Sequence, residues 1–431
     1  MGLLQLELLI FWGKKMKSDF NSVSMIGLGY IGLPTAAMLA SRKIKVIGVD
    51  INQHAVDTIN RGEIHIVEPE LDIIVQAAVS QGYLRATTKP ESADAFLIAV
   101  PTPFKGDHEP DLSYVEAAAK SIAPVLKKGD LVILESTSPV GATEQMAVWL
   151  ADARSDLTFP HQVGEKADVN IAYCPERVLP GKVVQELVSN DRVIGGMTIR
   201  CSQRATDLYK TFVEAECIPT NARTAEMCKL TENSFRDVNI AFANELSIIC
   251  GKLGINVWEL IKLANHHPRV NILQPGPGVG GHCIAVDPWF IVSKTPEEAR
   301  LIHSARLVND GKPHYVVEQV IGAAANVPNP VIACLGLAFK PDIDDLRESP
   351  AMEVVHLLAQ RKQGQILVVE PHIERKPASL VEFDNIELVS ADEAVRRANI
   401  IVMLVSHHSF YEIDKRLLKE KTVIDTRGVW Q

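Results

Sequence analysis

Short apolar runs alternate with segments of helical periodicity over the first half of the chain. Val23, Met25 and Ile26 sit in the first run, and glycine or proline follows most of the runs. Continuous apolar runs between helical segments predict a parallel sheet covered by helices on both faces. The predicted strands are Ser22–Ile26, Lys45–Val49, Ala95–Val100, Leu131–Glu135 and Ile171–Cys174.

The pattern becomes helical beyond residue 204. Residues 204–214, 225–251 and 257–264 repeat apolar positions with the period of a helix and carry hardly any strand signal. The second of these helices carries Lys229 and Asn233, which lie four residues apart and therefore share one face. Apolar residues cover several faces of this helix, so we expect it to be buried between domains or at a subunit interface.

Strand patterns return near Pro328. We expect strands at residues 331–335, 365–369, 400–404 and 422–425, with a helix at 351–361. The fold class is therefore α/β: two Rossmann-like doubly wound domains joined by a long central helix and a helical middle domain. The predicted boundaries are an N-terminal extension (1–21), a dinucleotide-binding domain (22–204), a helical domain (205–325) and a C-terminal Rossmann-like domain (326–431).

Composition narrows the class of protein. With 47% hydrophobic and 23% charged residues and a net charge of −9, the chain is typical of a globular protein without a basic nucleic-acid footprint. Seven scattered cysteines favour a reducing, cytoplasmic location. The apolar stretch Leu3–Phe11 is too short to span a bilayer, and its lysines follow it, whereas those of a signal peptide precede the apolar run.

A glycine-rich turn follows the first predicted strand. In the sequence Gly27-Leu28-Gly29-Tyr30-Ile31-Gly32, the first glycine suits a tight turn, the second a close approach to a pyrophosphate, and the third packing of helix on strand. Asp50 ends the second strand, where its carboxylate can accept hydrogen bonds from ribose hydroxyls. An acid there disfavours the additional phosphate of NADP, so the sequence predicts NAD.

Polar residues follow the other strands of the first domain. Thr102, Ser136, Thr137, Glu176 and Arg177 all stand at carboxyl ends, where ligands bind in open α/β sheets. The alternative for the hydroxyl residues is that they cap the following helices.

The loop Pro275–Asp287 contains four glycines, two prolines, Cys283 and Asp287. Glycine-rich backbone at residues such as Gly280 permits close approach of a substrate, and a thiol with a carboxylate four residues later suits nucleophilic catalysis. The alternative is a purely structural role, in which the loop is a turn and the cysteine is buried. His282 adjoins the thiol and either tunes it or packs the loop.

A second cluster of charge lies in the third region. Lys340 and Arg347 stand among acids, and they form either a local salt-bridge cluster or a phosphate clamp. No histidines have metal-ligand spacing, so we expect no metal site.

Taken together, these motifs resemble the UDP-glucose/GDP-mannose dehydrogenases, NAD-dependent enzymes that oxidise a nucleotide sugar's primary alcohol to a carboxylate. The resemblance spans nearly the whole chain from Val23 and is greatest to the branch acting on UDP-N-acetyl-D-mannosamine in bacterial surface-polysaccharide (enterobacterial common antigen-like) biosynthesis. Members acting on UDP-glucose usually have a lysine where this chain has Val286, which argues for another sugar. The motifs that carry the resemblance are Gly27-x-Gly29-x-x-Gly32, Pro101-Thr102-Pro103, Ser136-Thr137, Pro175-Glu176-Arg177, Lys229-Leu230-Thr231-Glu232-Asn233, Asn244-Glu245, Gly280-Gly281-His282-Cys283, Phe339-Lys340 and Asp345-Leu346-Arg347-Glu348-Ser349-Pro350.

The resemblance implies a role for each site residue. Cys283 forms a thiohemiacetal and then a thioester, Lys229 and Asn233 stabilise the negative oxygen, and either Asp287 or Glu176 activates water that Thr137 helps to place. The cofactor would be held by Gly27, Gly29, Tyr30, Ile31, Gly32, Asp50, Thr102, Thr137 and Arg347. The UDP-sugar would be held by Glu176, Arg177, Lys229, Asn233, Arg269, Gly280 and Lys340.

The resemblance also implies a homodimer built on the central helix. Two rival functions remain: a two-electron hydroxyacid-type dehydrogenase, and a sensor that binds NAD and nucleotide without turnover. The hydroxyacid-type enzyme has no use for Cys283 or for a third α/β domain, and the sensor would not need Cys283, Lys229 and Asp287 together. The sugar itself stays open between UDP-N-acetylmannosamine, its glucosamine and galactosamine epimers, and UDP-glucose.

Overall fold

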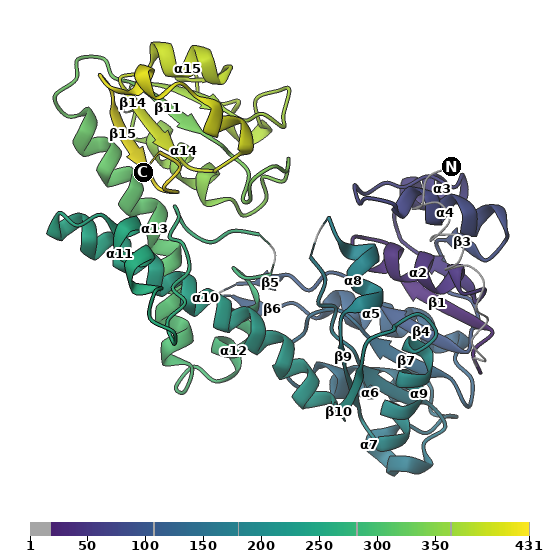
Figure 1. Ribbon diagram of the computed structural model, residues 1–431. Helices are drawn as coiled ribbons and strands as arrows, with labels where there is room; N and C mark the ends of the chain where they lie inside the picture. Colours follow the sequence, from purple (N-terminus) through teal and green to yellow (C-terminus); the bar gives the residue numbers. More distant parts are fainter. Residues whose placement is uncertain (1–18, 107, 180, 282, 363, 431) are drawn as a thin grey trace. The chain divides into compact units, whose positions relative to one another are not determined.

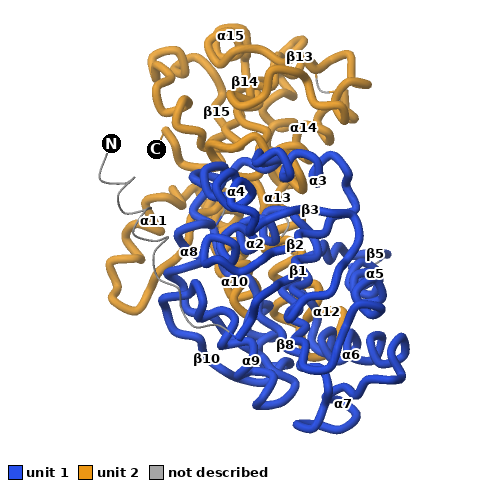
Figure 2. Tube along the Cα trace, turned by 90° about the vertical axis from the view of Figure 1, so that its right-hand side faces the viewer, with its two compact units in different colours: residues 1–230 blue, residues 231–431 orange. Residues whose placement is uncertain are grey.

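The computed structural model describes residues 19–106, 108–179, 181–281, 283–362 and 364–430. The predicted N-terminal extension lies outside the described residues up to position 18, as does His282. The chain forms two compact units, one ending at Leu230 and the other beginning at Thr231 (Figure 2).

An eight-stranded sheet forms the centre of the first unit (Figure 1). All its pairings are parallel except β8 with β9. In spatial order the strands are β10 (Cys217–Asn221), β9 (Arg192–Gly196), β8 (Asn170–Tyr173), β7 (Leu131–Leu134), β4 (Ala95–Ile98), β1 (Ser22–Ile26), β2 (Lys45–Val49) and β3 (Leu84–Thr87).

Alternate side chains of each strand enter two separate cores, because successive residues of a strand face opposite sides of the sheet. Val23, Met25 and Leu97 join one core, whereas Ile26 and Phe96 join the other. The first core is covered by α2 (Gly32–Ser41), α3 (Gln53–Asn60), α4 (Leu71–Ser80), α8 (Val183–Ser189) and α9 (Ile199–Tyr209). The second is covered by α5 (Ser113–Ile122) and α6 (Ala142–Ala153).

The second unit contains a five-stranded parallel sheet and a group of helices. The sheet order is β13 (Ile386–Leu388), β12 (Gln365–Val369), β11 (Val331–Leu335), β14 (Ile400–Met403) and β15 (Thr422–Asp425). Its two faces are covered by α13 (Arg300–Ala324) with α14 (Pro350–Gln360), and by α15 (Ala391–Arg397). The remaining helices of this unit include α11 (Val257–Ala264) and α12 (Asp287–Lys294).

A single helix, α10 (Ala222–Leu253), begins in the first unit and continues into the second. Its first turns are anchored by Glu226, whose buried carboxylate accepts hydrogen bonds from the Gly141 and Thr143 backbone amides at the start of α6. This anchor replaces the side-chain cap that α6 lacks, because its N-cap residue is Gly141.

The second sheet repeats the first strand connection of the first sheet. Gly27 donates to the Val49 carbonyl, and Leu28 donates to Asp50. In the same way, Gly336 donates to the Val369 carbonyl, and Leu337 donates to Glu370. The architectural repeat expected from the sequence is therefore present at the level of individual hydrogen bonds.

Several elements differ from the sequence-based expectation, since strands β3, β9 and β13 were not predicted. The first sheet extends past residue 204, since α9 covers it and β10 pairs with β9 in a stretch that we expected to be helical. Helix α13 was not predicted.

Candidate functional site

The glycine turn after β1 has the shape that a dinucleotide requires. Gly27 has a φ of +91°, and a Cβ on Gly32 would lie 1.8 Å from the Gly27 carbonyl oxygen, so neither position accepts a side chain. Nothing lies within 4 Å of a Cβ placed on Gly29, which leaves room for a phosphate at the helix N-terminus. Tyr30 is exposed and Ile31 precedes the first turn of α2.

Asp50 is held at the end of β2 by two backbone amides. Its carboxylate accepts from Leu28 at 2.9 Å and from Asn52 at 2.9 Å, one at each oxygen. Each carboxylate oxygen can accept a second hydrogen bond, so Asp50 is oriented and still able to bind ribose hydroxyls. The residues of this turn therefore fit NAD.

The hydroxyl residues at the carboxyl ends of β4 and β7 connect the two loops that follow these strands. Thr102 Oγ1 donates to the Thr137 carbonyl at 2.5 Å, and Ser136 Oγ donates to the Val100 carbonyl at 2.7 Å. The N-caps of α5 and α6 are Leu112 and Gly141, so none of the three hydroxyl residues caps those helices.

Glu176 follows β8 in a buried ion pair. Its Oε2 accepts from Arg192 at 2.8 Å, and its Oε1 accepts from the Arg177 amide at 2.7 Å. The side chains of Glu176 and Arg192 are only 7% and 4% exposed, so the pair is largely removed from water. This geometry fixes the direction of the carboxylate.

Cys283 lies beside the N-terminus of α12 in the second unit. Its carbonyl accepts from the amides of Val286 and Asp287, which closes a tight turn between the two residues. Cys283 is exposed, whereas the Asp287 side chain is buried and accepts from Asn233 Nδ2 at 2.5 Å. The structure thus brings together three residues that are separated by up to 54 positions in the sequence.

The glycines before Cys283 are required by close packing. A Cβ on Gly280 would lie 2.3 Å from the Glu348 carbonyl oxygen, and one on Gly281 would lie 2.9 Å from the Phe339 ring. Gly281 also has a φ of +83°. The loop is therefore pressed against the segment that carries Lys340.

A buried polar network holds the other side of this loop. Gly276 donates to Asn244 on α10, and Asn244 donates to Asn309 on α13. Asn309 in turn donates to Asp237, which also pairs with Arg306 at 2.6 Å. All four side chains are buried, so the loop rests on a rigid support that the sequence pattern did not reveal.

The two charged residues of the third region behave differently from one another. Arg347 makes a bidentate ion pair with Asp345 at 2.8 and 2.6 Å, as the local salt-bridge reading expects. The Arg347 side chain is 57% exposed, so little free energy opposes its transfer to a ligand. Lys340 and Arg269 are exposed.

Arg427 is a candidate ligand-binding residue that the sequence analysis did not identify. It follows β15, and its Nη1 lies 2.6 Å from a Cβ placed on Gly276. Its Nε donates to the Leu404 carbonyl, and no carboxylate pairs with its guanidinium within the described ranges. Burial lowers the pKa of Arg427 to about 10. Its position just beyond the end of a strand was the available signal.

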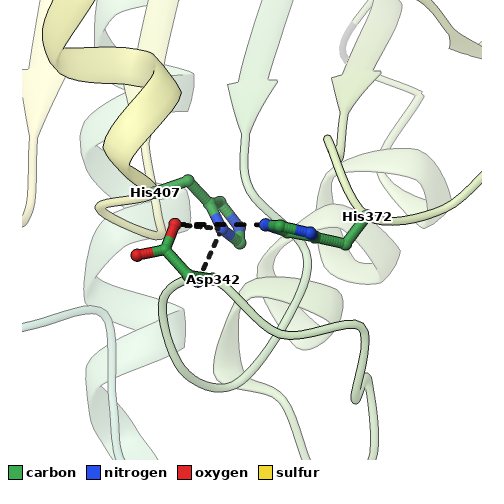
Figure 3. Close-up of side chains that lie close together, drawn as sticks. All are labelled: Asp342, His372 and His407. Atoms are coloured by element: carbon green, nitrogen blue, oxygen red, sulfur yellow. Dashed lines mark hydrogen bonds and ion pairs between the residues drawn. The ribbon is translucent and has the colours of Figure 1, made fainter. Parts of the chain in front are cut away.

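Asp342, His372 and His407 form a cluster whose ligand atoms all lie within 4.8 Å of one another (Figure 3). The buried His407 already uses both ring nitrogens: Nδ1 accepts from the Asp342 amide at 2.9 Å, and Nε2 lies 3.1 Å from Glu370. A metal bound to either nitrogen of His407 would have to displace the interaction at that nitrogen. Glu370, which contacts His407, also accepts from the Leu337 and Ala338 amides. We therefore interpret these residues as a structural network that holds the loop after β11 in place.

Three family models cover the chain in order. They are the NAD binding domain (residues 21–213), the central domain (223–311) and the UDP binding domain (333–431) of the UDP-glucose/GDP-mannose dehydrogenase family. Among the described helices, none combines the length and apolar character needed to cross a bilayer.

Two kinds of relative are about equally similar to the chain. A UDP-N-acetyl-D-mannosamine dehydrogenase of Yersinia pestis is 68% identical over 96% of this chain and 100% of its own. An NDP-N-acetyl-D-galactosaminuronic acid dehydrogenase of Ralstonia solanacearum is 67% identical over 97% of this chain and 98% of its own.

Two solved structures have the same fold over nearly the full length. The UDP-D-ManNAc dehydrogenase of Pyrococcus horikoshii is 38% identical with a TM-score of 0.85, covering 95% of this chain and 96% of its own. The UDP-glucose dehydrogenase of Pyrobaculum islandicum is 28% identical with a TM-score of 0.82, covering 96% and 95%. The chain belongs to the UDP-glucose/GDP-mannose dehydrogenase family and is an NAD-dependent nucleotide-sugar dehydrogenase.

Proposed function

We propose that this enzyme oxidises C6 of UDP-N-acetyl-D-mannosamine to a carboxylate through a covalent intermediate on Cys283. The observation that carries the proposal is the place of the exposed Cys283, whose carbonyl accepts from the amide of Asp287, the buried residue that pairs with Asn233. An alcohol that becomes an acid loses four electrons, and NAD, when bound, accepts each pair as a hydride. A thiol that captures the aldehyde between the two steps prevents its escape.

The reaction assigns a step to each group. After the first hydride leaves, the Cys283 sulfur adds to the aldehyde carbon to give a thiohemiacetal. Loss of the second hydride from that carbon gives a thioester. Water then attacks the carbonyl carbon, its proton passes to a carboxylate, and the C–S bond breaks to release the acid and the thiol.

The groups around these steps are suited to them. Lys229 and Asn233 lie four residues apart on α10 and can donate to the developing oxyanion. Asp287 and Glu176 are the two candidates for the water-activating base, with Thr137 placing the water. Arg427, Lys340, Arg177 and Arg269 would bind the UDP-sugar, together with the Gly280 backbone, and Arg347 would leave Asp345 to contact the cofactor.

The choice of sugar is supported by the relatives named for UDP-N-acetyl-D-mannosamine. The second candidate is an N-acetylgalactosamine nucleotide, because a relative of equal identity is named for N-acetylgalactosaminuronic acid. The proposed role in surface-polysaccharide biosynthesis depends on UDP-N-acetyl-D-mannosamine being the substrate. A Cys283 thiol must stay reduced, which supports the cytoplasmic location expected from seven cysteines, none of which forms a disulfide with another described cysteine.

We also propose a homodimer built on α10. Phe235, Phe242 and Ile249 recur every seven residues along this helix and are 70%, 52% and 43% exposed. A seven-residue repeat places all three on one side of a helix, and apolar stripes of this kind mark association surfaces.

The deciding measurement is NADH formed per sugar consumed, using UDP-N-acetylmannosamine, its N-acetylgalactosamine counterpart and UDP-glucose. We expect two NADH per UDP-N-acetylmannosamine and no acid product with Cys283→Ala. One NADH per sugar and an unaffected Cys283→Ala enzyme would contradict the thioester route. If two NADH form only with the N-acetylgalactosamine nucleotide, the thioester route is supported but the substrate is that sugar and not UDP-N-acetylmannosamine.

A further inference from the structure

A buried cluster of charged and hydroxyl groups lies behind Glu176 in the first unit. Glu135 follows β7, and Cys174 and Glu176 follow β8. Because β9 runs antiparallel to β8, its first residue, Arg192, reaches the same carboxyl edge of the sheet. Tyr209, the last residue of α9, completes the cluster.

Arg192 occupies the centre of this cluster. Its Nη2 donates to Glu176 at 2.8 Å, and its Nη1 lies 3.7 Å from the Cys174 sulfur. The guanidinium lies 4.7 Å from the centre of the Tyr209 ring, a cation–π distance. The Tyr209 hydroxyl donates to Glu135 Oε1 at 2.5 Å.

The cluster contains one fixed positive charge and two carboxyl groups. Arg192 is bonded to Glu176, whereas Oε2 of Glu135 has no hydrogen-bond partner among the described residues. An unpaired carboxylate in a buried site is costly, so Glu135 retains a proton into the neutral range. Burial raises the pKa of Glu135 to about 7, with the nearby Arg192 opposing the shift and the Glu176 charge adding to it.

We propose that Arg192 and Glu135 are positioning residues for Glu176, with Arg192 holding the Glu176 carboxylate and Glu135 controlling how firmly it is held. While Glu135 is protonated and neutral, Glu176 is the only carboxylate in the cluster that pairs with the Arg192 charge. When Glu135 ionises, Arg192 is shared between two carboxylates, and Glu176 is freer to accept a proton from the water that attacks the thioester. The inference rests on the proposed function, because the role of Glu176 belongs to it.

The groups facing Glu135 support this division of charge. They are Arg192 from β9, Tyr209 from α9, and Glu176 with Cys174 from the segment after β8. Arg192 is the only cation among them, so its charge must divide between Glu135 and Glu176.

The test compares the pH dependence of kcat in the wild type, Glu135→Gln and Arg192→Lys. We expect Glu135→Gln to remove an ionisation in the neutral range from the kcat profile and to leave KM for sugar and NAD within about twofold. We expect Arg192→Lys, which keeps the charge but not the two-pronged geometry, to lower kcat by roughly 10²-fold. Single-turnover traces separate the hydride steps from thioester hydrolysis, and only hydrolysis should slow.

Asp130→Asn is the matched control. Asp130 precedes the same strand, β7, at its opposite end, and burial raises its pKa to about 6. Its kcat profile should match that of the wild type. A wild-type profile for Glu135→Gln, in an enzyme that binds NAD and unfolds normally, would overturn the inference. Loss of the two-NADH stoichiometry in the wild type itself would instead overturn the proposed function.

Discussion

At the scale of single residues, the candidate site combines partners that are close in the chain with partners that only the fold brings together. Cys283 and Asp287 were recognisable because they lie four positions apart in one loop. Arg192 could not be recognised in this way. It is the first residue of a short strand, and its ion pair with Glu176 depends on an antiparallel strand pairing that the sequence pattern does not predict. Residue types predict chemistry well only when the partners are close in the chain.

Glu135 gives a stability prediction at this scale. Its pKa is near 7 in the folded protein against an ordinary value of 4.5, so ionising it in the folded state costs about 3 kcal/mol. Well below pH 4.5 the residue is protonated in both states and does not affect stability. Between pH 4.5 and 7 the unfolded state releases its proton while the folded state keeps it, so the free energy of unfolding falls as the pH rises.

Glu135→Gln cannot ionise and should therefore gain stability relative to the wild type at high pH. Urea unfolding of the two proteins at pH 8 should show the variant to be more stable, and the difference should shrink as the pH falls and vanish near pH 4. An equal difference at both pH values would exclude burial of an ionisable carboxyl as its cause.

At the scale of elements, the sequence predicted most strands with a continuous apolar run, whereas it did not predict β3, β9, β10, β13 or helix α13. Apolar runs predicted the bounds of β1, β2, β11, β12 and β15 to the residue. Strand β10 escaped because Pro219 and Asn221 interrupt a five-residue run at the edge of the sheet. Helix α13 escaped because it buries polar residues, and its Pro313 is a signal against a helix.

The cysteine loop provides a test of an element. Gly280→Ala would place a methyl group 2.3 Å from the Glu348 carbonyl oxygen, so the loop must shift away from the segment it packs against. Overpacking of this kind costs about 1–3 kcal/mol, and a displacement of about 1 Å near the reacting atoms can lower kcat by roughly 10²-fold. Turnover and unfolding free energy measure the two effects.

Gly322→Ala is the control for that substitution. Gly322 lies within α13, and nothing surrounds its Cβ position within 4 Å, so the variant should be active and up to about 1 kcal/mol more stable. Full activity in Gly280→Ala would show that the loop does not need this close contact.

The whole molecule presents one feature that the chain alone leaves unexplained, which is the apolar stripe on α10. The sequence predicted a buried helix, yet Phe235, Phe242 and Ile249 are exposed in the single chain. The predicted burial of α10 and the exposure of these side chains in the single chain are both explained if a second copy of the chain covers the stripe. In such an isologous contact the same surface of each copy faces the other.

Phe242→Asp should therefore yield a monomer, since an aspartate at the centre of an apolar contact is desolvated without a partner. Sedimentation equilibrium would report the mass, and the wild type should show an unfolding temperature that rises with protein concentration while the variant does not. Val381→Asp, at a position 61% exposed in the C-terminal sheet domain, is the matched control and should keep the wild-type mass. If Phe242→Asp and the wild type sediment alike, the stripe is not the surface that joins two copies, and the exposed phenylalanines require another partner.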